Sequence, residues 1–333
     1  MRGAWRVKPM RPQAAHAPRI THHVPMGLLD FILNLVGLLL WFNWRAARFD
    51  PLSKSTPATL AGTLRRAEKT SLKVWHLPLG ILVLLVVRAL FYNFIYSEFG
   101  SALNWAGRVD FGVISVPFCG KTSSLFTMLL YSIYSFGVTL GVFLMWALLL
   151  SVLKTNAPEN DSLRLLLRLH LGDVERWSWL TKSILPLLII TPLWWVGSWL
   201  LTHWTILPPV TGAAQRAEQA ILVGLGSYLA WKYLIVGALF LYFVNSYVYF
   251  GKQPFWQHLE VVGRLLLWPM RRLPLRFGKM DFSPLAGIGM VLLAAQLLQY
   301  GIQFPSGNDA SGKAKARWID VPGLVDLYTR ASK

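Results

Sequence analysis

Charged residues are scarce in this chain of 333 amino acids, since Asp, Glu, Lys and Arg together make up only 14% of it. In soluble domains the same four types account for about 25% of residues. Hydrophobic residues reach 54%, and 16 residues are tryptophan, which gathers at membrane–water interfaces. A soluble fold of this composition would lack the polar residues needed to cover its surface. The composition therefore predicts an integral membrane protein and excludes most soluble enzyme classes.

Cysteine and acidic residues are also rare. The single cysteine, Cys119, excludes an internal disulfide and a cysteine-rich metal site. No His, Asp and Glu set recurs at metal-site spacing within the apolar runs, and no Walker loop, Gly-x-Ser-x-Gly motif or intramembrane carboxylate pair is present. We therefore expect no metal, no cofactor and no enzymatic activity. Fifteen acidic against 33 basic residues give a net charge of +18, which indicates cytoplasmic loops that meet anionic lipid headgroups.

Six apolar runs have the length and composition of membrane spans, the first being short. They cover residues 27–42, 77–96, 125–151, 183–204, 220–243 and 283–304. The predicted fold class is thus an all-α, polytopic transmembrane protein. The connecting loops 1, 3 and 5 carry 18 Lys or Arg, whereas loops 2 and 4 carry three. Because Lys and Arg favour the cytoplasmic side, loops 1, 3 and 5 should be cytoplasmic and both termini outside.

The spans form three pairs that share one plan, which predicts three helix–loop–helix repeats. In each pair a basic loop leads to a proline at the start of the second span, at Pro78, Pro186 and Pro284. Proline is tolerated in the first turn of a helix, and the simpler alternative is that prolines often lie at span ends. The predicted organisation is a basic extension (1–25), unit 1 (26–98), unit 2 (123–204), unit 3 (219–304) and a polar tail (305–333).

The basic extension conflicts with the predicted topology, because its five basic residues favour the cytoplasm whereas the amino terminus should lie outside. We hypothesise that Met26 is the true initiator. Amino-terminal sequencing of protein made from its native gene tests this, and a terminus at residue 1 or 2 would refute it.

The fifth loop carries the most specific pattern. Residues 256–268 place apolar side chains on one helical face and polar ones largely opposite, which is typical of a helix at the membrane interface. Pro269 ends this helix, and the bent connector that follows holds arginines able to face lipid phosphates. Asp281 and Ser283 directly precede or begin the last span, where they can cap its amino end.

This segment resembles the signature of the YggT (YlmG) family of membrane proteins, in which a Pro-Leu-Arg-Arg-like run leads through proline and glycine to Asp-x-Ser-Pro. The matching residues are Pro269, Arg271, Arg272, Gly278, Asp281, Ser283 and Pro284. The resemblance is close over residues 240–304. Units 1 and 2 resemble diverged copies that keep the outline but lack Asp-x-Ser-Pro.

The resemblance implies a non-catalytic assembly or organising factor of the bacterial inner membrane. The roles known for the family are maturation of a membrane complex or cytochrome, organisation of the nucleoid or division site, and osmotic homeostasis. The implied partners are other membrane proteins and anionic lipid headgroups, with an oligomer left open and nucleic acid disfavoured. The alternative function is an ion transporter or channel component, which requires a polar path through the spans.

Four polar residues lie inside predicted spans, where an ionisable residue is a functional candidate. Arg88 lies roughly 12 Å from the outer end of its span, a depth similar to that of Asn34 and close to that of Asp30. A structural tie of Arg88 to Asp30 and Asn34 and a transport pathway both remain open. Lys232 has no acidic partner in any predicted span.

Two further patterns concern helix surfaces. Gly137 and Gly141 form Gly-x-x-x-Gly in the third span, which predicts close packing of another helix. Arg164 and Arg168 share a face of an amphipathic stretch that ends at Gly172, which predicts a second interfacial helix. Nucleic-acid binding by these arginines is the weaker alternative.

The predicted topology can be tested at Cys119, which lies in the second loop and should face outward. A membrane-impermeant maleimide is expected to label Cys119 in intact spheroplasts, because the charge distribution places this loop outside. Labelling that occurs only after lysis, with an accessible thiol in the lysed sample, would reverse the orientation.

Overall fold

Within the residues that it describes, the computed structural model contains six helices long and apolar enough to cross a membrane, so all six predicted spans are confirmed as helices. The structure describes residues 24–49, 75–103, 107–118, 124–153, 162–210, 212–248, 254–268, 276–277, 280–302, 305–308, 314–316 and 321–332. The spanning helices are α1 (Val24–Phe49), α3 (His76–Leu103), α4 (Leu125–Leu153), α6 (Trp179–His203), the pair α7 (Ala213–Gly226) and α8 (Trp231–Tyr247), and α10 (Ser283–Tyr300).

Most spans differ from their predicted bounds: α1 and α3 run about two turns further, to Phe49 and Leu103, and α10 ends at Tyr300, before the predicted residue 304. Helix α6 begins at Trp179 because the Ser178 side chain accepts a hydrogen bond from the backbone N–H of Thr181, which caps the helix before the apolar run starts. The fifth span runs through Ala213–Tyr247 as α7, the 3₁₀ turn η2 (Ser227–Ala230) and α8. Its polar first turns lie outside the apolar run, so hydropathy alone did not include them.

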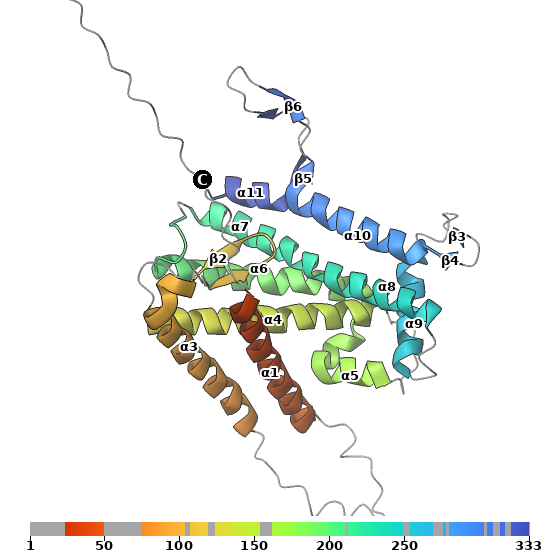
Figure 1. Cartoon of the computed structure of the whole chain (residues 1–333), viewed down its shortest axis with the longest axis horizontal. Helices are drawn as coiled ribbons and strands as arrows, with labels where there is room; N and C mark the ends of the chain where they lie inside the picture. Colours follow the sequence, from red (N-terminus) through yellow and green to blue (C-terminus); the bar gives the residue numbers. More distant parts are fainter. Residues whose placement is uncertain are drawn as a thin grey trace, which may run out of the picture.

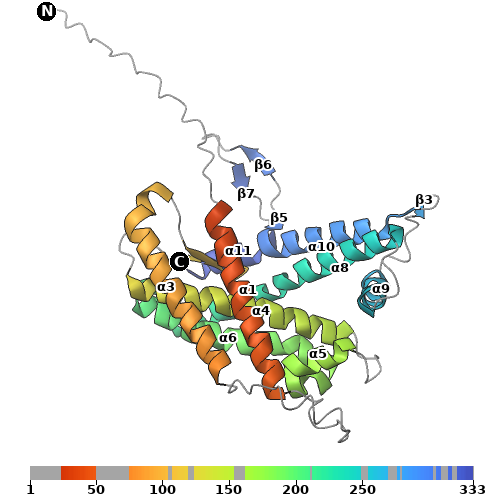
Figure 2. The ribbon, with the colours of Figure 1, turned by 60° about the horizontal axis from the view of Figure 1, so that its bottom comes forward.

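The spans form two groups. Helices α4, α6, α7–α8 and α10 run roughly along one direction, and α1 and α3 cross them steeply (Figures 1 and 2). Loops 3 and 5 emerge at one end of the first group, and loops 2 and 4 at the opposite end (Figure 1). This alternation matches the order in which the chain was predicted to cross a bilayer.

Two amphipathic helices lie at the end that carries loops 3 and 5 (Figure 1). They are α5 (Ser162–Leu171), followed by η1 (Gly172–Arg176), and α9 (Pro254–Leu266). Both confirm the helices predicted from residues that share one helical face. Gly172 has φ +62°, a left-handed conformation that lets the chain leave α5 at this point.

Short strands, none of them predicted, complete the fold. Strands β1 (Arg108–Asp110) and β2 (Ser115–Pro117) form an antiparallel hairpin in loop 2, and β3 (Arg276–Phe277) pairs with β4 (Met280–Asp281) in loop 5. After α10, β5 (Gly301–Ile302) pairs with β8 (Val321–Pro322), and β6 (Pro305–Asn308) pairs with β7 (Ala314–Ala316).

The segment predicted as a polar tail also holds a helix, α11 (Leu324–Arg330), that packs on α7 and α10. Tyr328 and Ala331 are buried in the largest hydrophobic cluster, and the Gln219 side chain donates to the Ala331 carbonyl at 2.9 Å. Burial raises the pKa of Tyr328 to about 12. The carboxyl-terminal segment is therefore part of the folded core and closes one end of the bundle.

Candidate functional site

A cluster of polar side chains joins α1, α3 and α4 inside the bundle. Arg88 of α3 forms an ion pair with Asp30 of α1. Its Nη1 donates to Asn34 Oδ1 at 2.6 Å, and its Nη2 donates to Ser135 Oγ of α4 at 2.8 Å. Only 1% of the Arg88 side chain is exposed. The tie of Arg88 to Asp30 and Asn34, one of the two interpretations that the sequence left open, is thus present.

Two tyrosines complete the cluster around the Asp30 carboxylate. Tyr92 donates to Asp30 Oδ1 at 2.8 Å, and Tyr131 donates to Asp30 Oδ2 at 3.0 Å. The Arg88 guanidinium lies 5.5 and 5.6 Å from the centroids of the same two rings, within range of cation–π attraction. The buried charge is therefore shared among several donors and aromatic faces, and it neutralises itself inside the protein.

The sequence held a signal for the residues that the prediction missed. The cluster consists of three pairs spaced four residues apart, one on each helix: Asp30/Asn34, Arg88/Tyr92 and Tyr131/Ser135. Residues four apart share a helix face, so each span presents one polar stripe of two residues. The same spacing is visible in the sequence and identifies Tyr92, Tyr131 and Ser135 as further members of the intramembrane polar cluster.

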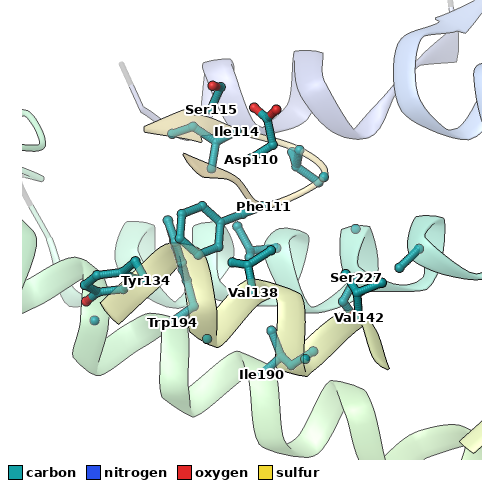
Figure 3. A pocket seen from close by; sticks show the side chains of 18 of the residues that line it. Asp110, Phe111, Ile114, Ser115, Tyr134, Val138, Val142, Ile190, Trp194 and Ser227 are labelled. Atoms are coloured by element: carbon teal, nitrogen blue, oxygen red, sulfur yellow. The ribbon is translucent and has the colours of Figure 1, made fainter. Parts of the chain in front are cut away.

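A cavity of about 960 Å³ lies apart from this cluster, between α4, α6, α7–α8 and the β1–β2 hairpin. Phe111 points from the hairpin toward the helices below it (Figure 3). The centroid of its ring lies 4.7 Å from that of the Trp194 ring. The tip of the hairpin is seated on Gly226, where an added Cβ would lie 2.1 Å from Val113 Cγ2. The hairpin therefore forms a wall that requires glycine on the neighbouring helix.

Gly137 and Gly141 line this cavity, and among the described residues no atom of another helix lies within 4 Å of the position of a Cβ on either. The prediction that they pack closely against another helix is therefore wrong for this chain. Lys232 lines the same cavity, with its ammonium 5.0 Å from the Tyr233 ring centroid. None of the ion pairs within the described ranges includes Lys232.

The predicted positions in loop 5 are described in part. Asp281 Oδ1 accepts the backbone N–H of Ser283, the first residue of α10, at 2.9 Å, so Asp281 satisfies one free N–H of the first turn as expected. The N-cap position itself is Phe282, which makes no side-chain cap, and Ser283 lies inside the helix, so the predicted cap by Ser283 is wrong. Pro284 is buried in the first turn of α10. The remaining predicted positions lie outside the described residues: Pro269, Arg271, Arg272, Gly278 and, in loop 2, Cys119.

The arginines of α5 have a structural partner. Arg164 Nε donates to Glu175 Oε1 at 2.8 Å, and Arg168 Nε lies 3.8 Å from Glu175 Oε2. This pairing ties α5 to the turn that follows it, and it leaves less of the arginine charge for an external ligand. Among the residues that the structure describes, no three His, Cys, Asp or Glu side chains are placed to hold a metal ion.

Comparison with known proteins adds no relative to these observations. No protein-family model, no curated protein and no solved structure matches this chain. What is shown is a polytopic helical protein with six candidate membrane spans.

Proposed function

We propose that this protein is a non-catalytic assembly or organising factor of the YggT type, embedded in the membrane. The observation that carries the proposal is a platform formed by α5 and α9 at one end of the bundle (Figure 1). An assembly factor needs a surface held rigidly at the membrane interface, whereas a transporter needs a polar path. The contacts of α5 and α9 with the rest of the bundle provide such a rigid surface.

Helix α9 is fastened to the bundle by its apolar face. Leu259 and Val262 are buried against Ala238 of α8, with Leu150 and Leu153 of α4 packed around them. Gly263 permits a close approach to α8, since an added Cβ would lie 2.6 Å from the Tyr242 ring. The other face of α9 carries Val261 and Leu265, which are exposed, and the exposed Trp268 follows just beyond the end of the helix. This outer face is free to meet lipid headgroups or a partner protein.

Helix α5 is fastened at its carboxyl end. Arg45 of α1 donates to the carbonyl oxygens of Leu169 at 3.2 Å and His170 at 3.0 Å, which pairs a cation with the negative end of the helix. The His170 ring packs edge-on against Phe42 and Phe143, and its burial lowers the pKa of the imidazole. A neutral His170 suits this apolar contact, so α5 is held firmly.

The transporter alternative lacks comparable support. The Arg88 cluster is closed on itself and contributes no side chain to the cavity, whose lining is mostly apolar. Ion flux in proteoliposomes that disappears with Arg88→Ala or Lys232→Ala would favour the alternative and count against an organising role.

The platform is tested by removing its outer apolar face. The triple variant Val261→Ala/Leu265→Ala/Trp268→Ala should insert and fold normally but fail to complement a deletion strain. On a native gel, the membrane complex that forms with the wild-type protein should be absent with the variant. The matched control is Leu79→Ala/Leu82→Ala/Val83→Ala on the exposed face of α3, which should complement. Full complementation by the α9 variant would refute the proposed platform.

The arginines of the connector provide a second test of the YggT-type role. Arg271→Ala/Arg272→Ala should leave the protein inserted but impair function, with a loss of roughly 1 kcal/mol of anionic-lipid contact for each arginine. Arg271→Lys/Arg272→Lys keeps the charge but loses the planar fork that grips phosphate or carboxylate, so it should also fail. If the lysine pair complements a deletion strain fully while the alanine pair does not, the arginines are only a topology signal.

A further inference from the structure

Lys232 lines an apolar cavity, and no ion pair among the described residues includes it, although its ammonium lies over the Tyr233 ring. The pairing of α4 with the long fifth span fixes its position: the Trp231 indole donates to the Met145 carbonyl at 3.1 Å, and the Trp146 indole donates to the Ala230 carbonyl at 2.8 Å. An ionised lysine inside a span costs about 2.5–3.5 kcal/mol at the membrane centre unless it reaches water, headgroups or an anion. A partner of negative charge would remove this cost.

The depth of Lys232 matches that of a lipid headgroup more closely than that of the bilayer centre. Helix α4 has 29 residues and is about 43 Å long, so a centred α4 extends roughly 6 Å beyond each face of a hydrocarbon core of about 30 Å. Met145 lies about 12 Å from the end of α4 that carries α5. Lys232, beside it, is therefore roughly 5 Å inside the hydrocarbon boundary, within reach of a lysine stem.

The rest of the cavity suits an acyl chain. Its lining on α4 extends from Leu130 to Met145, about 22 Å along the helix, which exceeds the roughly 15 Å that a chain spans in one leaflet. The volume of about 960 Å³ falls at the upper end of the range for small-ligand sites, about 300–1,000 Å³. The absent side chains of Gly137 and Gly141 create part of this space.

The cavity is also open to the surroundings of the protein. Leu193 and Val196 of α6 contribute to its lining and are 68% and 55% exposed, and Tyr233 is 63% exposed on the α8 side. Asp110 is the acidic residue in the described lining, its carboxylate points away from the helices that form the floor (Figure 3), and none of the ion pairs among the described residues joins it to Lys232. In a bilayer, the molecule next to this opening is a lipid.

We infer that the cavity binds one anionic phospholipid, with its phosphate on the Lys232 ammonium and one acyl chain laid along Gly137 and Gly141. This inference goes beyond the proposed assembly role. It concerns a part of the protein separate from the α5–α9 platform, so either can fail without the other.

Native mass spectrometry of the delipidated protein, titrated separately with phosphatidylglycerol, phosphatidylcholine and oleate, tests the inference. The wild type should bind phosphatidylglycerol at least about fivefold more tightly than phosphatidylcholine, the preference expected for one lysine–headgroup contact. Lys232→Ala should abolish this preference, and Lys232→Arg should keep it. Gly141→Leu should weaken the binding of both phospholipids, because the leucine side chain fills the cavity. Leucine favours a helix more than glycine does, so the last variant should fold.

The control is Arg330→Ala, which removes an exposed positive charge on α11 and should leave the preference unchanged. Equal affinities for the two phospholipids, a preference that survives Lys232→Ala, or a preference lost equally in Arg330→Ala would each overturn the site. Tighter binding of oleate than of phosphatidylglycerol would overturn the phospholipid assignment. A Gly141→Leu variant that disrupts a protein complex but leaves both lipid affinities intact would indicate a partner helix in the cavity, which also overturns the inference.

Discussion

Asp30→Leu should lower the free energy of unfolding by about 3–5 kcal/mol, because it leaves the Arg88 guanidinium buried without its counter-ion. The loss is expected to be large since Arg88 is almost completely inaccessible and the cluster joins three helices. Unfolding in mixed detergent–SDS micelles, followed by circular dichroism, measures it. The variant should insert normally, because removing an acidic residue from a span does not oppose insertion.

The double variant Asp30→Leu/Arg88→Leu separates the lost ion pair from lost packing. Replacing a buried pair by apolar side chains is often close to neutral, so at least half of the stability should return. The surface control is Glu260→Leu, which breaks the exposed pair with Arg264 on α9 and should cost less than about 1 kcal/mol. A double variant as unstable as the sum of both single variants would show that the charges themselves are not what holds α1 and α3 to α4.

Gly301→Ala should release α11 from the bundle. Gly301 has φ +71° and ψ −163°, a region of backbone conformation open essentially to glycine alone. An alanine Cβ would lie 2.0 Å from the Val321 carbonyl oxygen and 2.5 Å from the Gly323 nitrogen, so the β5–β8 pair cannot close. With a cost of about 3 kcal/mol, the open form should rise roughly a hundredfold.

Hydrogen exchange measured by mass spectrometry detects this release. The amide of Leu327, bonded to the Gly323 carbonyl, and that of Ala331, bonded to the Leu327 carbonyl, should lose about a hundredfold in protection. The control is Gly289→Ala in the middle of α10, where a Cβ meets no atom within 4 Å and alanine favours the helix. Unchanged protection of α11 in Gly301→Ala would mean that the β5–β8 pair does not hold the carboxyl-terminal helix.

Elements that depend on local pattern were predictable. The amphipathic spacing in loops 3 and 5 predicted α5 and α9, and Asp281 was predicted to cap α10 because it stands just before an apolar run. The Arg88 tie was predictable from depth alone, since an arginine and an aspartate at similar heights on neighbouring spans both need a partner. In each case the physical cause lies within a few residues or along a single axis.

The Gly-x-x-x-Gly motif marks a helix surface whose packing partner is not determined by the local sequence. Gly137 and Gly141 mark a helix face without side chains, and such a face can hold another helix or leave a space. The choice depends on the hairpin tip seated on Gly226 and on how α6 and α7 flank α4, which no local pattern encodes. The sequence predicted the surface of α4 correctly but not what faces it.

The sequence alone determined that this chain enters a membrane with six helices, which of its loops carry the basic residues, and where the interfacial helices and the carboxylate at the amino end of α10 lie. These properties follow from hydropathy, charge and helical periodicity, which act residue by residue or along one helix. Only the tertiary structure decided that Asp30 is shared by Tyr92, Tyr131 and Ser135, that α11 closes one end of the bundle, and that Lys232 faces a cavity. Each of these depends on the packing of segments from different parts of the chain, where steric fit among many side chains selects one arrangement.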